Sequence, residues 1–164
     1  MKKLILALAL SVGSFFGPAN IPAIAQSSEA GWQFTTWGMS VDELKAASPV
    51  PISNSPDNCS GHTPYSNPYS TGSFDFVACY HFNANGLYHV RLQLLDLKQG
   101  AKLREALEDL YGVGRRENPL GTLNITWRSE NFRVSFNDSQ QAFGSIAPRR
   151  INVNYYSYQD STGL

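Results

Sequence analysis

Both cysteines of the chain and all three of its histidines lie within residues 59–89. The five side chains are Cys59, His62, Cys79, His81 and His89. Thiolates and imidazoles are ligands that zinc and copper accept, so this cluster could hold a metal ion. In an oxidising compartment, however, two cysteines form a disulfide, and this bond removes both thiolates. We predict the disulfide and keep metal binding as the alternative.

The chain carries none of the short motifs that mark common catalytic or nucleotide sites. It has no G-x-S-x-G, H-E-x-x-H, C-x-x-C, P-loop or Rossmann glycine pattern. A nucleophile built from Cys79 and a neighbouring histidine would need a free thiolate and an oxyanion hole, and no pattern marks either. We therefore predict a protein that is not an enzyme and has no catalytic residue, no bound metal and no cofactor.

The first 25 residues have the three parts of a signal peptide. A basic start precedes the apolar run 4–17, and an A-x-A cleavage signal ends at Ala25. The run is shorter than the ~20 residues that span a bilayer. No cysteine stands at the cleavage point, which argues against a lipoprotein. These features predict a periplasmic or secreted protein that begins at Gln26 and keeps no stable membrane anchor after cleavage.

Length and charge limit the partners of the exported chain. Residues 26–164 are enough for one domain. Without Lys2 and Lys3, eleven basic and thirteen acidic side chains remain, so the net charge is about −2. Binding to phosphate backbones needs a basic surface, and the composition therefore argues against nucleic acid. The predicted partner is another periplasmic or secreted protein.

The N-terminal part of the domain contains one helix and one long irregular segment. Loose alternation predicts a short strand over residues 31–37. Ser40 and Glu43 match a capping box, which starts a helix that ends before Pro49. Residues 49–73 are rich in proline and serine, and we expect a loop that a disulfide at Cys59 holds in place.

Two strands follow this loop. Apolar residues alternate with polar ones over 74–82 and again over 88–94, which is typical of half-buried strands. A three-residue loop with Gly86 in the left-handed region would point both apolar faces inward. This hairpin pairs Phe82 with Tyr88 and Tyr80 with Val90. The same register places His81 opposite His89 on the outer face.

The C-terminal half repeats the order of a helix and then strands. Residues 101–111 carry one apolar stripe and predict a helix. Strands are predicted over 123–127, 132–136 and 151–155, before a frayed tail at 160–164. We expect an α+β fold in which an antiparallel sheet of five or six strands has two helices packed on one face. Two α-βββ repeats are an open alternative.

The uncovered face of this sheet is the candidate binding surface. Tyr156 and Tyr158 are out of phase with the apolar residues of the last strand, and three arginines also point outward by alternation. Tyrosine and arginine are enriched in protein interfaces. The predicted surface consists of His81, His89, Arg91, Arg128, Arg133, Tyr156 and Tyr158.

Two short segments resemble small exported bacterial domains. They are W-G-M-S-x-x-E-L at residues 37–44 and F-N-A-N-G-L at residues 82–87. The helix-plus-meander order resembles β-lactamase-inhibitory protein and the small outer-membrane-assembly lipoproteins, although the lipidated cysteine of the latter is missing. The resemblance implies a non-enzymatic binding domain that presents a sheet face.

The predicted function is a non-catalytic exported binding or accessory module that uses its open sheet face for protein contact. The alternative is a metal-binding protein with ligands among the five cysteine and histidine residues.

Overall fold

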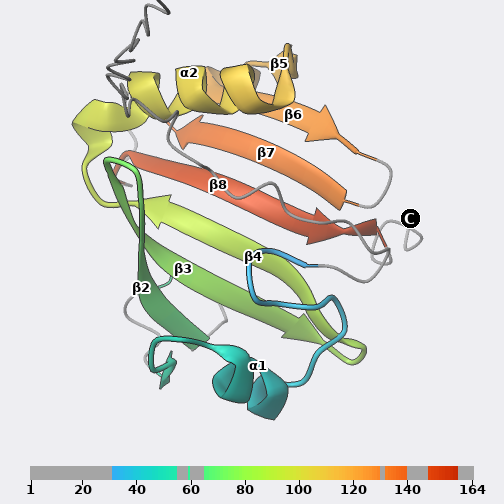
Figure 1. Ribbon diagram of the computed structural model, residues 1–164. Coiled ribbons are helices and arrows are strands. Elements are labelled where there is room, and N and C mark those ends of the chain that lie inside the picture. The colour runs from blue at the N-terminus through green and yellow to red at the C-terminus, as the bar shows by residue number, and fades with distance from the viewer. Residues whose placement is uncertain (1–30, 55–58, 60–64, 130–131, 140–147, 159–164) are drawn as a thin grey trace, which may run out of the picture.

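The computed structural model describes residues 31–54, 59, 65–129, 132–139 and 148–158 (Figure 1). These residues form one eight-stranded sheet with helices packed against it, and every strand pair is antiparallel. In chain order the α-helices and strands are α1 (Val41–Ala47), β1 (Ser53–Asn54), β2 (Tyr65–Thr71), β3 (Phe74–Asn83), β4 (Gly86–Leu94), α2 (Gly100–Tyr111), β5 (Arg115–Glu117), β6 (Thr122–Arg128), β7 (Phe132–Ser139) and β8 (Arg150–Ser157). Two short 3-10 helices, η2 (Leu97–Gln99) and η3 (Pro119–Gly121), precede α2 and β6. The α+β class is confirmed, whereas the prediction of five or six strands is wrong.

The two halves of the chain have the same order of elements. The sheet order is β1-β2-β3-β4-β8-β7-β6-β5. Each half is therefore a helix followed by a four-stranded meander, and the last strands of the two halves, β4 and β8, pair at the centre. The strands that the sequence did not predict are β1, β2 and β5. They are short or lack the alternation of apolar and polar residues. The β2 strand lies within the segment predicted as an irregular loop. It forms because β3 pairs with it along its whole length.

The hairpin of β3 and β4 differs from the predicted one at its turn. The pairs Tyr80–Val90 and His81–His89 are present as predicted. Beyond them Phe82 pairs with Leu87, and the register shifts at a bulge. The turn is thus one residue shorter than predicted and the extra residue is Tyr88, so Leu87 takes the inward position and is 1% exposed.

The N-terminal segment explains this change of register. Residues 31–37 form turns with only an isolated bridge at Thr36, so the predicted strand there is wrong. Gly38 donates its N–H to the carbonyl of Leu87 (2.8 Å), and Leu87 donates to the carbonyl of Met39 (2.9 Å). The N-terminal segment is thus a second backbone partner of Leu87, besides β3, and it fixes the orientation of this residue. No sequence pattern within the hairpin could indicate this pairing.

Both predicted helices are present. Ser40 and Glu43 form the capping box at the start of α1, with the Glu43 carboxylate accepting the Ser40 N–H at 2.7 Å. The α2 helix ends at Gly112, whose φ of 78° suits a glycine. In the described residues, neither helix has the length and apolar character that crossing a membrane requires.

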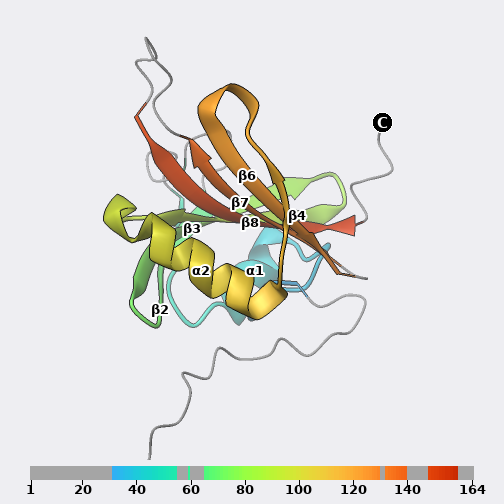
Figure 2. The same cartoon turned by 90° about the horizontal axis from the view of Figure 1, so that it is seen from above.

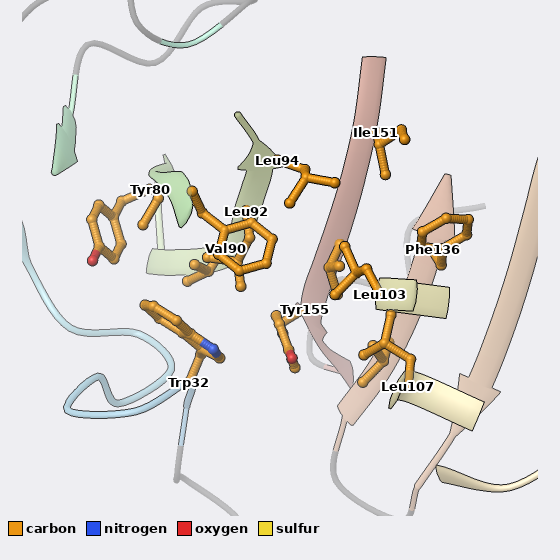
Figure 3. Close-up of a cluster of buried hydrophobic side chains, with 14 of the residues drawn as sticks. Trp32, Tyr80, Val90, Leu92, Leu94, Leu103, Leu107, Phe136, Ile151 and Tyr155 are labelled. Atoms are coloured by element: carbon orange, nitrogen blue, oxygen red, sulfur yellow. The ribbon is translucent and has the colours of Figure 1, made fainter. Parts of the chain in front are cut away.

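One hydrophobic core lies between the sheet and the helices. Figure 3 shows side chains of β3, β4, β7 and β8 facing Leu103 and Leu107 of α2. Leu44 of α1 is completely buried in the same core. All three tryptophans are buried there, at Trp32, Trp37 and Trp127. Figure 2 shows α2 running along one face of the sheet, which leaves the opposite face without a helix among the described residues.

Candidate binding surface on the outer sheet face

A row of cationic and aromatic side chains crosses the outer face, the face opposite the helices. Strand register aligns one residue from each of β3, β4, β8, β7 and β6. We call this the outer row, and it consists of His81, His89, Tyr156, Arg133 and Arg128. All five were predicted for the binding surface, and the structure brings them side by side.

The side chains of the outer row stack on one another. The imidazoles of His81 and His89 lie 4.3 Å apart between ring centroids, with 21° between their planes. His89 stacks in turn on Tyr156, at 4.3 Å and 9°. The guanidinium of Arg133 lies 4.4 Å from the centroid of the Tyr156 ring. Tyr156 is thus held between two flat groups, so binding a partner would restrict it little further.

Stacking keeps His89 out of water although it lies on the uncovered face. His89 is on the outer face, but only 8% of it is exposed because rings cover both of its sides. Burial, with a smaller contribution from the neighbouring His81, lowers the pKa of His89 to about 3. Burial, with nearby Arg91, lowers the pKa of His81 to about 4. Both imidazoles are therefore neutral in the native protein at pH 6.

We expect the protein to lose stability as the pH falls from 6.5 towards 4. In this window the unfolded chain binds protons on both histidines, whereas the native protein does not. The contribution is fully present above pH 6.5, and we expect its loss near pH 4 to reach about 3 kcal/mol from His89, with a smaller part from the less buried His81. Urea unfolding at each pH measures it. His81→Phe, which keeps a stacking ring, should flatten the slope, and an unchanged slope would contradict the assignment.

A chain of side-chain hydrogen bonds runs beside the outer row on the same face of the sheet. Asn137 donates to the amide oxygen of Asn124, and Asn154 donates to that of Asn137. The amide oxygen of Asn154 faces Nε2 of His89 at 3.0 Å, so in the neutral ring Nε2 carries the proton. The chain crosses from β6 to β4 and ends on the imidazole of His89. Sequence reasoning placed no function on these asparagines.

The outer face is hollowed over β5, β6, β7 and β8. The groove has a volume of about 680 Å³, and Arg115, Arg128, Arg133 and Tyr156 line it. Its only carboxylate from the described residues is Glu117, which pairs with Arg115 at 2.9 Å. Within the described ranges, Arg128 and Arg133 form no ion pair. The groove therefore carries an excess of positive charge although the chain as a whole does not.

Four residues of the predicted surface do not line the groove: His81 and His89 of the outer row, Arg91 and Tyr158. Arg91 is on the outer face between Cys79 and Asn154, and it is half-buried. Burial lowers the pKa of its guanidinium. Tyr158 follows the end of β8 and is also half-buried. Conversely, Arg115 lines the groove but was not predicted, because its three-residue strand carries no alternation signal.

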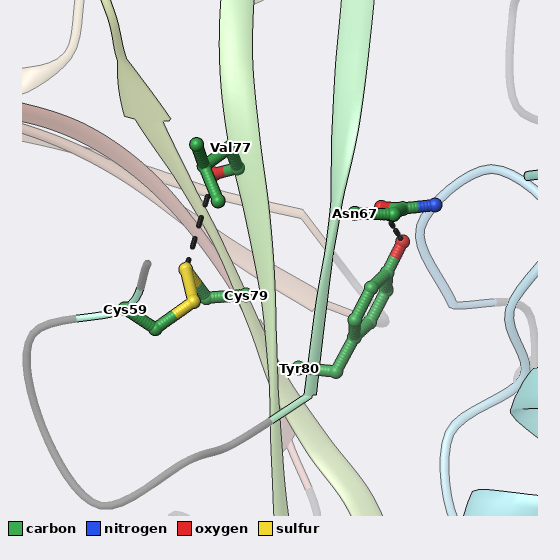
Figure 4. The surroundings of a disulfide bond; sticks show 5 residues. All are labelled: Cys59, Asn67, Val77, Cys79 and Tyr80. Atoms are coloured by element: carbon green, nitrogen blue, oxygen red, sulfur yellow. Dashed lines mark hydrogen bonds between the residues drawn. A yellow bond between two sulfur atoms is a disulfide. The ribbon is translucent and has the colours of Figure 1, made fainter. Parts of the chain in front are cut away.

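A disulfide joins Cys59 to Cys79 on the same face, which confirms the predicted bond. Figure 4 shows Cys79 and Tyr80 pointing to opposite sides of β3. The Tyr80 hydroxyl donates to the amide oxygen of Asn67 (3.0 Å) on the inner side. Both cysteines are buried, with 1% of Cys59 and 0% of Cys79 exposed.

The structure does not favour the alternative metal site. The disulfide removes both thiolates. Ring nitrogens bind metals in the plane of the ring, and the nearly parallel planes of His81 and His89 do not let their lone pairs converge. His62 lies outside the described residues. In the part of the chain that the structure describes, no group of three or more potential ligand residues could hold a metal ion.

Comparison with protein-family models, with curated proteins and with solved structures finds no match for this chain. The resemblance to small exported helix-plus-meander domains therefore stays a prediction from sequence.

Proposed function

We propose that this protein is a non-catalytic exported module that binds an acidic segment of another periplasmic or secreted protein in the outer-face groove. The observation that carries the proposal is the groove itself, with three arginines, one stacked tyrosine and a single paired carboxylate. Arginine guanidinium groups bind carboxylates through two parallel hydrogen bonds. An acidic segment of a partner would therefore complement the lining.

The rigid outer row supports this function. Side chains that are ordered before binding lose less conformational entropy when a partner arrives. Tyr156 and Arg133 are held by their mutual stacking, and Asn154, at the end of the asparagine chain, holds His89 beside them. Tyrosine and arginine are also residue types that dominate the energetics of protein interfaces. The disulfide supports the oxidising location that the signal peptide predicts.

We expect the double variant Arg128→Ala/Arg133→Ala to lose its partner. Proteins retained by the wild type from an extract of exported proteins should be identified by mass spectrometry, and one of them purified. Its affinity for the double variant should fall at least tenfold, which is about 1.4 kcal/mol. Raising the salt concentration should weaken wild-type binding, because groove and partner carry opposite charges.

Arg116→Ala is the matched control. Arg116 lies on β5, and it pairs with Glu108 of α2 rather than lining the groove. This variant should bind the partner as the wild type does. Equal binding by the double variant, or a partner whose binding is insensitive to salt, would refute the proposed groove.

A further inference from the structure

A partly enclosed cavity lies on the opposite side of the sheet, between the core face and α2. Its volume is about 340 Å³. Rings of Trp32, Tyr69 and Tyr155 form one part of the lining, and Leu103, Leu107 and Leu110 of α2 form another. Figure 3 shows Tyr155 between Trp32 and the two buried leucines of α2. We propose that this cavity binds a neutral aromatic molecule of about ten non-hydrogen atoms that carries one hydroxyl or carbonyl group.

The volume sets the size of the ligand. Known small-molecule sites have volumes of ~300–1,000 Å³, so this cavity is at the small end of the range. At ~30 Å³ for a water-sized group, it holds about ten such groups. The opening is at Leu110, which lines the cavity and is still 46% exposed. A ligand can therefore enter without unfolding the core.

The walls set the chemical class. Trp32 and Tyr69 meet edge to face, with 4.7 Å between ring centroids and 78° between planes. The rings of Trp32 and Tyr155 lie 6.1 Å apart at 37°. Flat walls of this kind suit a flat aromatic ligand. No lining residue among those described is charged, so a charged ligand would lose its hydration without gaining a partner.

A polar cluster within the lining positions one hydrogen-bonding group of the ligand. The side-chain amide of Gln33 donates to the hydroxyl of Tyr69 at 3.0 Å. Thr71 interacts with the same hydroxyl, and all three side chains line the cavity. A hydroxyl or carbonyl placed beside them could join this network. Lys102 lies over the Phe74 ring at 5.7 Å but is not part of the lining.

Three ligands that differ in one group test the proposal on the full mature protein. They are 2-naphthol, naphthalene and 2-naphthoate, with binding measured by calorimetry and by the fluorescence of 2-naphthol. We expect one saturable site for 2-naphthol, about fivefold weaker binding of naphthalene and at least tenfold weaker binding of 2-naphthoate. Absence of saturable 2-naphthol binding, or equal affinity for 2-naphthoate, would overturn the proposed ligand class.

Matched variants of α2 locate the site. Ala106 lines the cavity, whereas Ala101 is exposed on the same helix outside it. Ala106→Phe should weaken 2-naphthol binding at least tenfold, and Ala101→Phe should change it less than twofold. If circular dichroism shows that Ala106→Phe does not fold, Leu110→Trp at the opening should give at least a fivefold loss. Equal effects of the cavity and control variants would place the ligand elsewhere.

Tyr69→Phe tests the polar cluster separately. It removes the hydroxyl that Gln33 contacts and keeps the aromatic wall. The variant should bind 2-naphthol and naphthalene with the same affinity, and a retained preference for 2-naphthol would refute the role of this hydroxyl. These measurements do not involve the outer-face groove, whose variants Arg128→Ala/Arg133→Ala should bind 2-naphthol normally. The two proposals therefore fail or succeed independently.

Discussion

Gly86→Ala should lower the free energy of unfolding by about 3 kcal/mol. Gly86 has a φ of 98°, which side chains with a Cβ rarely adopt. A Cβ at this position would lie 2.1 Å from the carbonyl oxygen of Gly38 and 2.8 Å from that of Met39. The N-terminal segment would have to move away, which breaks its two backbone hydrogen bonds with Leu87.

Gly72→Ala is the matched control for this prediction. Gly72 lies in the turn between β2 and β3 with a φ of 58°, and no atom lies within 4 Å of the position its Cβ would take. Only backbone strain applies there, and we expect a loss of about 1 kcal/mol. Urea unfolding of both variants measures the difference. Equal losses of stability in the two variants would mean that the contact between the new Cβ and Gly38 has no effect on stability.

The double variant Cys59→Ser/Cys79→Ser should also lose about 3 kcal/mol of stability, because the disulfide closes a loop with a sequence separation of 20. Without this bond, the unfolded chain gains conformational freedom. Urea unfolding of the variant and of the wild type with a reducing agent should give the same loss. A wild-type intact mass that corresponds to two free thiols would contradict the bond itself.

Loss of this disulfide should lower stability without changing the groove on the outer face. Cys79 lies opposite Arg91 on β4, one position along β3 from Tyr80 and two from His81. The groove over β5–β8 is on the other half of the sheet. Partner binding should therefore survive in the cysteine variant at temperatures where it remains folded.

Much of the local structure could be predicted because its signals are short in range. The capping box of Ser40 and Glu43 and the apolar stripe of α2 involve neighbours within two helical turns. Alternation along β3, β4 and β8 likewise depends on each strand alone. These patterns correctly assigned the outer row to one face.

The errors arose where distant segments pair. The β2 strand has one proline and several polar residues, and it forms because β3 supplies its hydrogen bonds. Leu87 rather than Tyr88 turns inward because Gly38 and Met39 pair with it. Neither partner can be identified from the pattern of the segment itself, since hydrogen bonds between strands depend on register and not on local periodicity.

Sequence by itself determined the two helices, the central strands, the pairing of His81 with His89 and the choice of a disulfide from compartment and count. Tertiary structure alone decided the eight-strand order, the stacking that removes His89 from water, the arginine groove and the cavity beneath α2. The physical reason is that a periodic pattern fixes which way a side chain points. Only the packing of segments far apart in the chain decides what that side chain meets.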